Sequence, residues 1–170
     1  MVLIYVDDLI VTGNNHAAIT NLKSILHQQF SIKDLGVLKY FLGIEMVTSY
    51  KGLFFDQCKY ILDLLREADM LECKLAKTPL DSKLQLTLDG ESFDQPQLYQ
   101  KLVGKLIYLT ITRPDLSHSV SIVSQFMHSP IAAHMMIVKR ILRYLKGTIG
   151  RGILVQNHGH TQVLSYTDAD

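Results

Sequence analysis

The sequence predicts an α+β fold, in which antiparallel β-hairpins are followed by a group of helices. Short apolar runs separated by turn residues fill residues 2–55, which is typical of strands joined by tight turns. After residue 97, apolar residues recur at helical spacing instead. Between these parts, residues 73–97 lose their periodicity, and Pro79, Asp89-Gly90 and Pro96 indicate loops. We therefore expect a boundary between two subdomains there.

The first hairpin is expected around two adjacent carboxylates. The apolar run 2–6 leads directly into Asp7 and Asp8, and a second apolar run, 9–12, follows them. Neighbouring side chains on a strand point to opposite faces, so both carboxylates cannot face a core. This pattern predicts a hairpin with the acid pair at its tip.

The turn chemistry of that hairpin is unusual. Asp-Asp is not the Asn-Gly or Asp-Gly pair that such turns prefer. Adjacent carboxylates repel each other and favour a nearby cation. A hard divalent ion such as Mg²⁺ binds one or two carboxylates together with substrate phosphates, as in phosphoryl transfer. A solvated acidic turn is the alternative interpretation.

The elements after the hairpin follow from spacing and turn residues. Asn14 or Asn15 is suited to cap a helix in which apolar residues recur from Ile19 to Phe30, and Asp34-Leu35-Gly36 indicates a turn. Residues 38–46 alternate as in a strand, and Tyr50-Lys51-Gly52 turns into a second strand, 53–55. A helix then buries one face, made of Ile61, Leu64, Leu65 and Ala68.

Three further helices are predicted after residue 97. The first places Leu98, Leu102, Leu106 and Leu109 on one face. The second starts at Pro114 and includes Val120, Val123 and Met127. The third starts after Ser129-Pro130 and stops at Gly147. Residues 152–155 and 163–166 then predict two strands paired across a loop at 157–159.

Composition excludes several classes of protein. The net charge is only +1, so nucleic-acid binding would have to rest on local patches. The two cysteines are too few for a disulfide framework or a zinc cluster. No apolar run approaches the roughly 18 residues of a membrane span, and no basic segment precedes the first apolar run. We expect an intracellular protein, cytoplasmic or nuclear, that is neither secreted nor bound to membrane.

Several motifs extend beyond the acid pair, and together they resemble a known family. Tyr5-Val6-Asp7-Asp8 is followed, in the same order as in that family, by a series of blocks: Asp34-Leu35-Gly36, Tyr40-Phe41-Leu42-Gly43-Ile44-Glu45, Thr78-Pro79-Leu80, Leu102-Val103-Gly104, Tyr108-Leu109-Thr110, Thr112-Arg113-Pro114-Asp115, Arg143-Tyr144-Leu145-Lys146-Gly147-Thr148 and Tyr166-Thr167-Asp168-Ala169-Asp170. These blocks span essentially the whole chain. The sequence resembles the reverse transcriptase of copia-type retrotransposons.

The resemblance implies a division of the chain. Residues 1–72 would be the C-terminal part of the polymerase palm with its primer-grip hairpin, and 73–97 a linker. Residues 98–148 would be the helical thumb or connection, and 149–170 the first strands of a ribonuclease H-like domain. The chain starts and stops inside expected strands, so we expect a piece of a longer Pol polyprotein.

The resemblance also implies roles for residues of both hairpins. Asp7 would be the more direct ligand of two catalytic Mg²⁺ ions and Asp8 a second ligand. Tyr5 and Val6 would lie where the primer terminus meets the incoming nucleotide. The primer strand would be gripped by Phe41, Leu42 and Gly43. For this last group, an ordinary antiparallel strand is the alternative.

Further residues are implied in the helical and C-terminal parts. Basic residues at helical spacing would lie along template-primer phosphates, namely Lys139, Arg140, Arg143 and Lys146; a solvated helix face is the alternative. Asp168 would be the first metal-binding acid of ribonuclease H, in a site that lacks its other acids. We interpret Arg113-Pro114-Asp115 as a structural helix start.

The resemblance implies template-directed nucleotidyl transfer to a primer 3′-hydroxyl in the intact enzyme, with an RNA or DNA template-primer as its partner. The family's third catalytic carboxylate and its fingers precede the hairpin. We therefore expect Mg²⁺ binding to be weak or absent in this chain, and we expect no polymerisation without the remainder of the polyprotein. The alternatives are a catalytically dead remnant, a protein retained for binding nucleic acid or a partner, and an unrelated α+β interaction domain.

Overall fold

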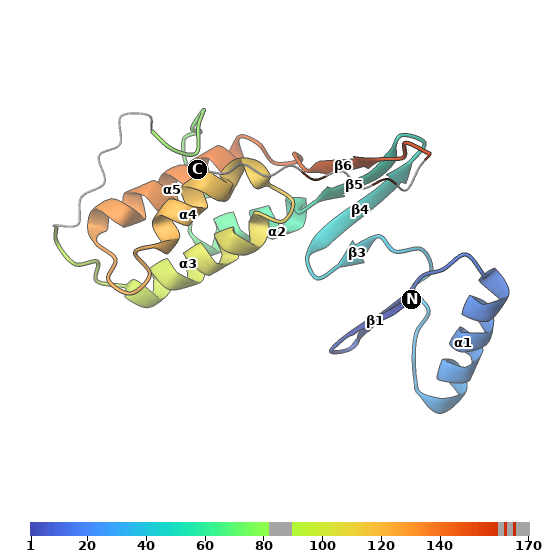
Figure 1. Cartoon of the computed structure of the whole chain (residues 1–170). Helices are drawn as coiled ribbons and strands as arrows, with labels where there is room; N and C mark the ends of the chain where they lie inside the picture. The colour runs from blue at the N-terminus through green and yellow to red at the C-terminus, as the bar shows by residue number, and fades with distance from the viewer. Residues whose placement is uncertain (82–89, 160–161, 163–164, 166–170) are drawn as a thin grey trace. The chain divides into compact units, whose positions relative to one another are not determined.

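A computed structural model describes residues 1–81, 90–159, 162 and 165. The chain forms two compact units, Met1–Lys39 and Tyr40–Asp170, whose elements are labelled in Figure 1. The fold is α+β with antiparallel sheets, as expected. The two units do not coincide with the four segments expected from the sequence, whose identities as polymerase subdomains stay predictions.

The first unit consists of β1 (Val2–Tyr5), β2 (Asp8–Val11) and α1 (His16–Gln29). β1 and β2 form an antiparallel hairpin, and Asn15 caps α1 by accepting a hydrogen bond from the Ala18 N–H at 3.0 Å. Both features confirm the prediction. The expected turn at residues 34–36 is stabilised by Asp34, which accepts from the Gly36 N–H at 2.9 Å and pairs with Lys23 at 2.9 Å.

The second unit contains a four-stranded antiparallel sheet of order β3-β4-β5-β6. Its strands are β3 (Tyr40–Phe41), β4 (Ile44–Ser49), β5 (Gly52–Asp56) and β6 (Ile153–Gln156). The alternating run 38–46 is therefore not one strand, because a turn at Leu42 and Gly43 divides it. β6 pairs with β5. The partner expected for it, residues 163–166, lies outside the described residues except for Ser165.

The helices of this unit are α2 (Cys58–Glu67), α3 (Pro96–Leu109), the 3-10 helix η1 (Pro114–Leu116), α4 (Ser117–Ser124) and α5 (Ala132–Lys146). The helix expected from Pro114 begins as the 3-10 turn, and α4 ends before Met127. Gly147 follows the end of α5 as predicted. Figure 1 shows α2 to α5 packed side by side.

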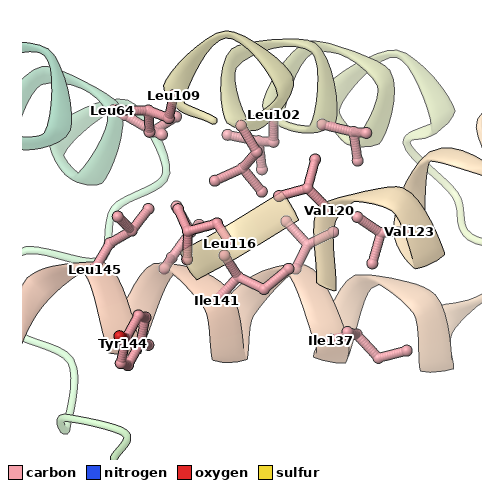
Figure 2. Close-up of a cluster of buried hydrophobic side chains, with 14 of the residues drawn as sticks. Leu64, Leu102, Leu109, Leu116, Val120, Val123, Ile137, Ile141, Tyr144 and Leu145 are labelled. Carbon is pink, nitrogen blue, oxygen red and sulfur yellow. The ribbon is translucent and has the colours of Figure 1, made fainter. Parts of the chain in front are cut away.

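A hydrophobic core joins these helices, and Figure 2 shows part of it. Every helix of the second unit contributes, including Leu64 of α2, Leu102 of α3, Leu116 of η1 and Val123 of α4, while Ile141 and Leu145 come from α5. The Tyr99 hydroxyl donates to the Val123 carbonyl at 2.7 Å, which satisfies a buried polar group between α3 and α4.

An ion-pair cluster joins α2 to α3 at the edge of this core. Glu67 pairs with both Lys101 and Lys105. Hydrogen bonds from these two ammonium groups lower the pKa of the Glu67 carboxyl.

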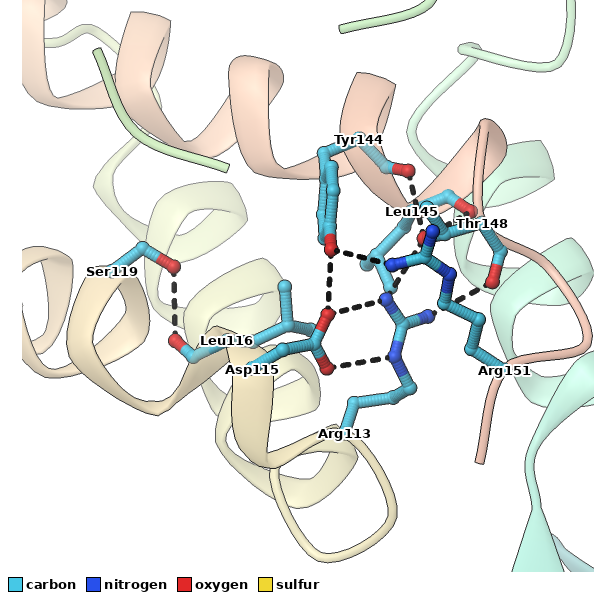
Figure 3. A network of polar contacts seen from close by, with 8 residues as sticks. All are labelled: Arg113, Asp115, Leu116, Ser119, Tyr144, Leu145, Thr148 and Arg151. Atoms are coloured by element: carbon cyan, nitrogen blue, oxygen red, sulfur yellow. Dashed lines mark hydrogen bonds and ion pairs between the residues drawn. The ribbon is translucent and has the colours of Figure 1, made fainter. Parts of the chain in front are cut away.

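A buried guanidinium joins η1 to the end of α5 (Figure 3). The Arg113 side chain is 1% exposed, and its Nε and Nη2 donate to the two Asp115 carboxylate oxygens at 2.9 and 2.8 Å. Its Nη1 and Nη2 also donate to the carbonyl and hydroxyl of Thr148 at 3.1 and 2.8 Å. The Tyr144 hydroxyl donates to Asp115 at 2.8 Å. The interpretation of Arg113-Pro114-Asp115 as structural agrees with this geometry.

Replacing Arg113 by Met should destabilise the second unit. The change leaves Asp115 without its cation and the Thr148 carbonyl without a donor. Breaking a buried ion pair costs about 3–5 kcal/mol, and we expect about 3, because the Asp115 side chain is 37% exposed. Urea unfolding measures the loss.

The matched control for that measurement is Arg66→Met. Arg66 also pairs with an aspartate, Asp63, at 2.5 Å, but both side chains are more than half exposed. Exposed pairs contribute about 0.2–1 kcal/mol. Equal losses for the two variants would contradict the structural role of Arg113.

Replacing Gly152 by Ala should detach β6 from β5. A Cβ at Gly152 would lie 2.0 Å from the Phe55 carbonyl oxygen, so the strands would have to separate. We expect the amide of Ile153 to lose protection from hydrogen exchange. Gly104→Ala is the control, because nothing lies within 4 Å of a Cβ there. That substitution in α3 should stabilise the chain by about 0.5–1 kcal/mol. Unchanged protection of Ile153 in the Gly152 variant would contradict the β5–β6 register.

Candidate functional site

The acid pair lies at the tip of the β1–β2 hairpin, as predicted, but the two carboxylates differ in position. Tyr5 faces Asp8 across the hairpin, so the connecting turn consists of Val6 and Asp7 alone. Asp7 is therefore a turn residue, whereas Asp8 is the first residue of β2. Both are exposed, and the turn places them together on the chain's surface.

The turn carries backbone strain at Val6. Its φ is +48°, in the left-handed region that a β-branched residue rarely adopts. Glycine or asparagine would fit a two-residue hairpin turn without this cost. Backbone strain of this kind is enriched at functional sites, so the turn is a candidate for one.

The two carboxylates form only part of a metal site. Among the residues that the structure describes, no three His, Cys, Asp or Glu side chains are grouped so as to hold a metal ion. Mg²⁺ requires near-octahedral oxygen coordination. Two adjacent carboxylates fit part of that ligand set, so further ligands would have to come from substrate, water or another segment.

The surroundings of this hairpin are not a packed core. No side chain of Met1–Lys39, all of which the structure describes, is buried. Large apolar residues are exposed instead, including Val2, Leu3 and Ile4 of β1 at 45%, 48% and 70%. A two-stranded hairpin is marginally stable on its own, so this unit needs other contacts to hold its carboxylates in place.

The second candidate hairpin, β3–β4, has a turn with two positive φ values. Leu42 has φ +51° and Gly43 has φ +85°, while Phe41 faces Ile44. Two positive φ values are characteristic of the type I′ turn that suits a two-residue hairpin. Gly43 meets this requirement without strain, and Leu42 does not.

Two tyrosines from the helices contact this turn. The Tyr108 hydroxyl of α3 donates to the Leu42 carbonyl. A Cβ at Gly43 would lie 3.3 Å from the Tyr60 ring of α2. The two rings contact each other edge to face, with centroids 5.4 Å apart. Neither Tyr60 nor Tyr108 has a role predicted from the sequence, although Tyr108 begins the motif Tyr108-Leu109-Thr110.

The start of α2 is tied to the sheet by two carboxylates, one from β4 and one from the end of β5. Glu45 of β4 accepts from the Lys59 N–H at 2.9 Å, and Asp56 accepts from the Cys58 N–H at 3.1 Å. Both satisfy free N–H groups at a helix N-terminus. Burial, with the Asp56 contact, raises the pKa of the Cys58 thiol to about 11, which disfavours the thiolate form of this cysteine.

The predicted basic face of α5 is divided by the structure. Lys139 and Arg143 are exposed. Arg140 instead pairs with Asp81 at 3.2 Å and donates to the Thr78 hydroxyl at 3.1 Å. Lys146 donates to the Cys73 carbonyl at 2.9 Å. These contacts hold segment 73–81, expected as part of a linker, against α5.

Asp168 lies outside the described residues, so the predicted ribonuclease H acid has no structural account. Within the described ranges, no helix has the length and hydropathy needed to cross a membrane.

Comparison with a family model gives a match over residues 1–82, to a family described as reverse transcriptase (RNA-dependent DNA polymerase). The match includes both hairpins and α2. No solved structure matches the chain.

Similar proteins extend the likeness to the whole chain. An uncharacterized mitochondrial protein of Arabidopsis thaliana is 42% identical over 99% of this chain and 70% of its own length. The retrovirus-related Pol polyprotein from transposon RE1 of the same plant is 43% identical over 99% of this chain. That from transposon TNT 1-94 of Nicotiana tabacum is 37% identical over 100%. The chain spans only 12% and 14% of these two polyproteins.

Proposed function

This chain belongs to the reverse transcriptase family of retrovirus-related Pol polyproteins, and we propose that it is the part of a copia-type polymerase that contains the catalytic hairpin, the primer grip and the thumb. In the intact enzyme this region takes part in template-directed nucleotidyl transfer to a primer 3′-hydroxyl. Its partners are an RNA or DNA template-primer and the remainder of the polyprotein.

The observation that carries the proposal is the hairpin of Tyr5, Val6, Asp7 and Asp8. A two-residue turn with a strained valine presents one carboxylate in the turn and the next at the start of β2. Tyr5 and Val6 then flank the primer terminus. A purely structural role does not explain this turn. Its residues are exposed and contribute nothing to a core, and Val6 is poorly suited to a positive φ.

The family uses divalent metal ions, and Mg²⁺ is the ion we propose. Asp7 and Asp8 would hold it, and the ion would supply charge neutralisation for phosphoryl chemistry. The described residues hold no third ligand beside them. We therefore expect the isolated chain to bind Mg²⁺ weakly and not to extend a primer, because the other ligand and the nucleotide site belong to the remainder of the polyprotein.

The primer and the duplex would be bound by the second unit. Phe41, Leu42 and Gly43 lie at the tip of the β3–β4 hairpin and form the proposed primer grip. Lys139 and Arg143 are the exposed cations of α5 and the stronger candidates for phosphate contacts. Arg140 and Lys146 hold segment 73–81, and their proposed role is to shape that face. Asp168 as a ribonuclease H acid also stays a proposal.

One observation favours a second function. The Arabidopsis mitochondrial protein, of which this chain covers 70%, is far shorter than the Pol polyproteins. A protein of that size could be a catalytically dead remnant or one retained for binding nucleic acid or a partner. The two functions differ in whether Asp7 and Asp8 still serve catalysis.

A chimeric polymerase tests the proposal. This chain replaces the matching segment of the RE1 Pol polyprotein, to which it is 43% identical. We expect Mg²⁺-dependent primer extension, and we expect Asp7→Asn to reduce it roughly 100-fold or more, because losing even a partner of a metal ligand costs about 10–100-fold.

Two controls separate the outcomes of this experiment. Unmodified RE1 polyprotein establishes the assay. A chimera that carries the matching segment of the TNT 1-94 polyprotein, 37% identical to this chain, controls for the exchange itself. An inactive chimera beside active controls would support the dead remnant. Activity that survives Asp7→Asn would contradict the catalytic role of the hairpin.

Neutralising the exposed cations should weaken duplex binding by the purified chain. For Lys139→Gln with Arg143→Gln, we expect the slope of log affinity against log salt to fall by about 2, or about one for each lost phosphate contact. The affinity for an RNA–DNA hybrid is measured by fluorescence anisotropy between 50 and 200 mM salt, roughly the range in which such slopes are read.

A second pair of lysines controls for net charge. Lys33→Gln with Lys51→Gln changes the charge equally but lies outside α5. The same loss of slope in both variants would indicate attraction by overall charge and would remove α5 from the proposed binding surface.

A further inference from the structure

The turn at the tip of the β3–β4 hairpin is fixed from a distant part of the chain. The Tyr108 hydroxyl donates to the Leu42 carbonyl across 66 residues of sequence. Leu42 has φ +51°, so this hydrogen bond restrains the carbonyl of the residue in the turn that adopts a strained backbone conformation. Leu42 itself is 37% exposed, whereas Phe41 and Gly43 on either side of it are half-buried.

The strands below the tip are fixed by different contacts. β4 pairs with β5 over five residue pairs, and Glu45 accepts from the Lys59 N–H at 2.9 Å. These contacts set the direction of β4, but they lie beyond Ile44. The orientation of the Leu42–Gly43 peptide depends on the contacts of the turn itself, of which the Tyr108 hydrogen bond comes from a helix.

Tyr108 is well placed to transmit the position of the helices to that tip. It lies in the last turn of α3, between the buried residues Leu106 and Leu109. Its ring packs against Tyr60 of α2. A shift of α3 relative to the sheet would therefore move the donor that holds Leu42.

We infer that Tyr108 is a positioning residue for primer binding, and that its hydroxyl sets the orientation of the Leu42–Gly43 turn from helix α3. This inference rests on the proposed function, because it assumes that the turn contacts the primer strand. Under this inference, helix α3 of the proposed thumb contacts the proposed primer grip directly, through the hydrogen bond from Tyr108 to Leu42. The nucleic acid itself is contacted by the hairpin, and Tyr108 acts through it.

Tyr108→Phe tests the inference in the purified 170-residue chain. Phenylalanine keeps the ring and its contact with Tyr60 and removes only the hydroxyl. We expect amide exchange at Ile44, which pairs with Phe41 across the turn, to become about fivefold faster, which is what one net hydrogen bond is worth. We also expect a similar fall in affinity for an RNA–DNA hybrid with a recessed primer end, with the thermal midpoint of the helices unchanged.

Tyr50→Phe is the matched control, because Tyr50 is 92% exposed and lies at the other end of β4. It should change neither the exchange nor the affinity. A second variant, Gly43→Ala, should imitate Tyr108→Phe, since a Cβ there meets φ +85° and the Tyr60 ring at 3.3 Å.

The two readouts distinguish the inference from the proposed function. Faster exchange at the turn together with weaker hybrid binding supports the inference. Unchanged exchange in Tyr108→Phe overturns it, whatever the binding result. Faster exchange with unchanged hybrid binding also overturns it, because the turn would then not position the primer. A wild-type chain that binds no hybrid at all would contradict the proposed function, and with it the inference that rests on it.

Discussion

The Arg113 guanidinium is the interaction on which the second unit depends. It is buried at the point where η1 meets the end of α5, and its donors are matched by Asp115 and Thr148. Burying a cation costs free energy unless it is paired and hydrogen-bonded, so the stability of this site depends on Asp115 and Thr148 together. The network therefore joins two motifs that are separated along the sequence, one with Arg113 and Asp115 and the other with Tyr144 and Thr148. It also lowers the pKa of the Asp115 carboxyl, chiefly through the Arg113 hydrogen bonds.

The two units differ in what stabilises them. The helices of the second unit share a core, and the sheet is attached to them by Tyr108, Glu45 and the Asp56 cap. The first unit buries no side chain, although it carries the two carboxylates of the proposed active site. A catalytic pair on a hairpin without a core depends on neighbouring polypeptide for its precision. This is the physical reason why the proposed activity belongs to the intact polyprotein.

Both proposed functional tips share a geometric feature. Each is a two-residue turn that places a non-glycine residue, Val6 or Leu42, at positive φ. Such residues are costly in a turn that serves only to reverse the chain. In the second hairpin the carbonyl of the strained residue accepts the Tyr108 hydrogen bond, which links the tip to α3. Segment 73–81 is held in a comparable way, by Arg140 and Lys146 of α5.

The sequence alone determined the elements whose signals are local. The acid-tipped hairpin, the Asn15 cap, the helices with a regular apolar stripe and the Gly147 stop all depend on residues a few positions apart, and so does the family resemblance carried by short motifs. Only the tertiary structure decided the features that join distant segments. Alternation from Leu38 to Met46 predicted one strand, although Gly43 is a local signal for the turn that divides it; the contact of that turn with Tyr108, 66 residues away, needed the fold. Spacing on α5 could not separate Lys139 and Arg143 from Arg140 and Lys146, because the groups that engage the latter pair lie on segment 73–81. The pairing of β6 with β5 likewise could be seen only in the tertiary structure. The alternation of side chains along a strand shows which residues share a face, but not which strand lies beside it.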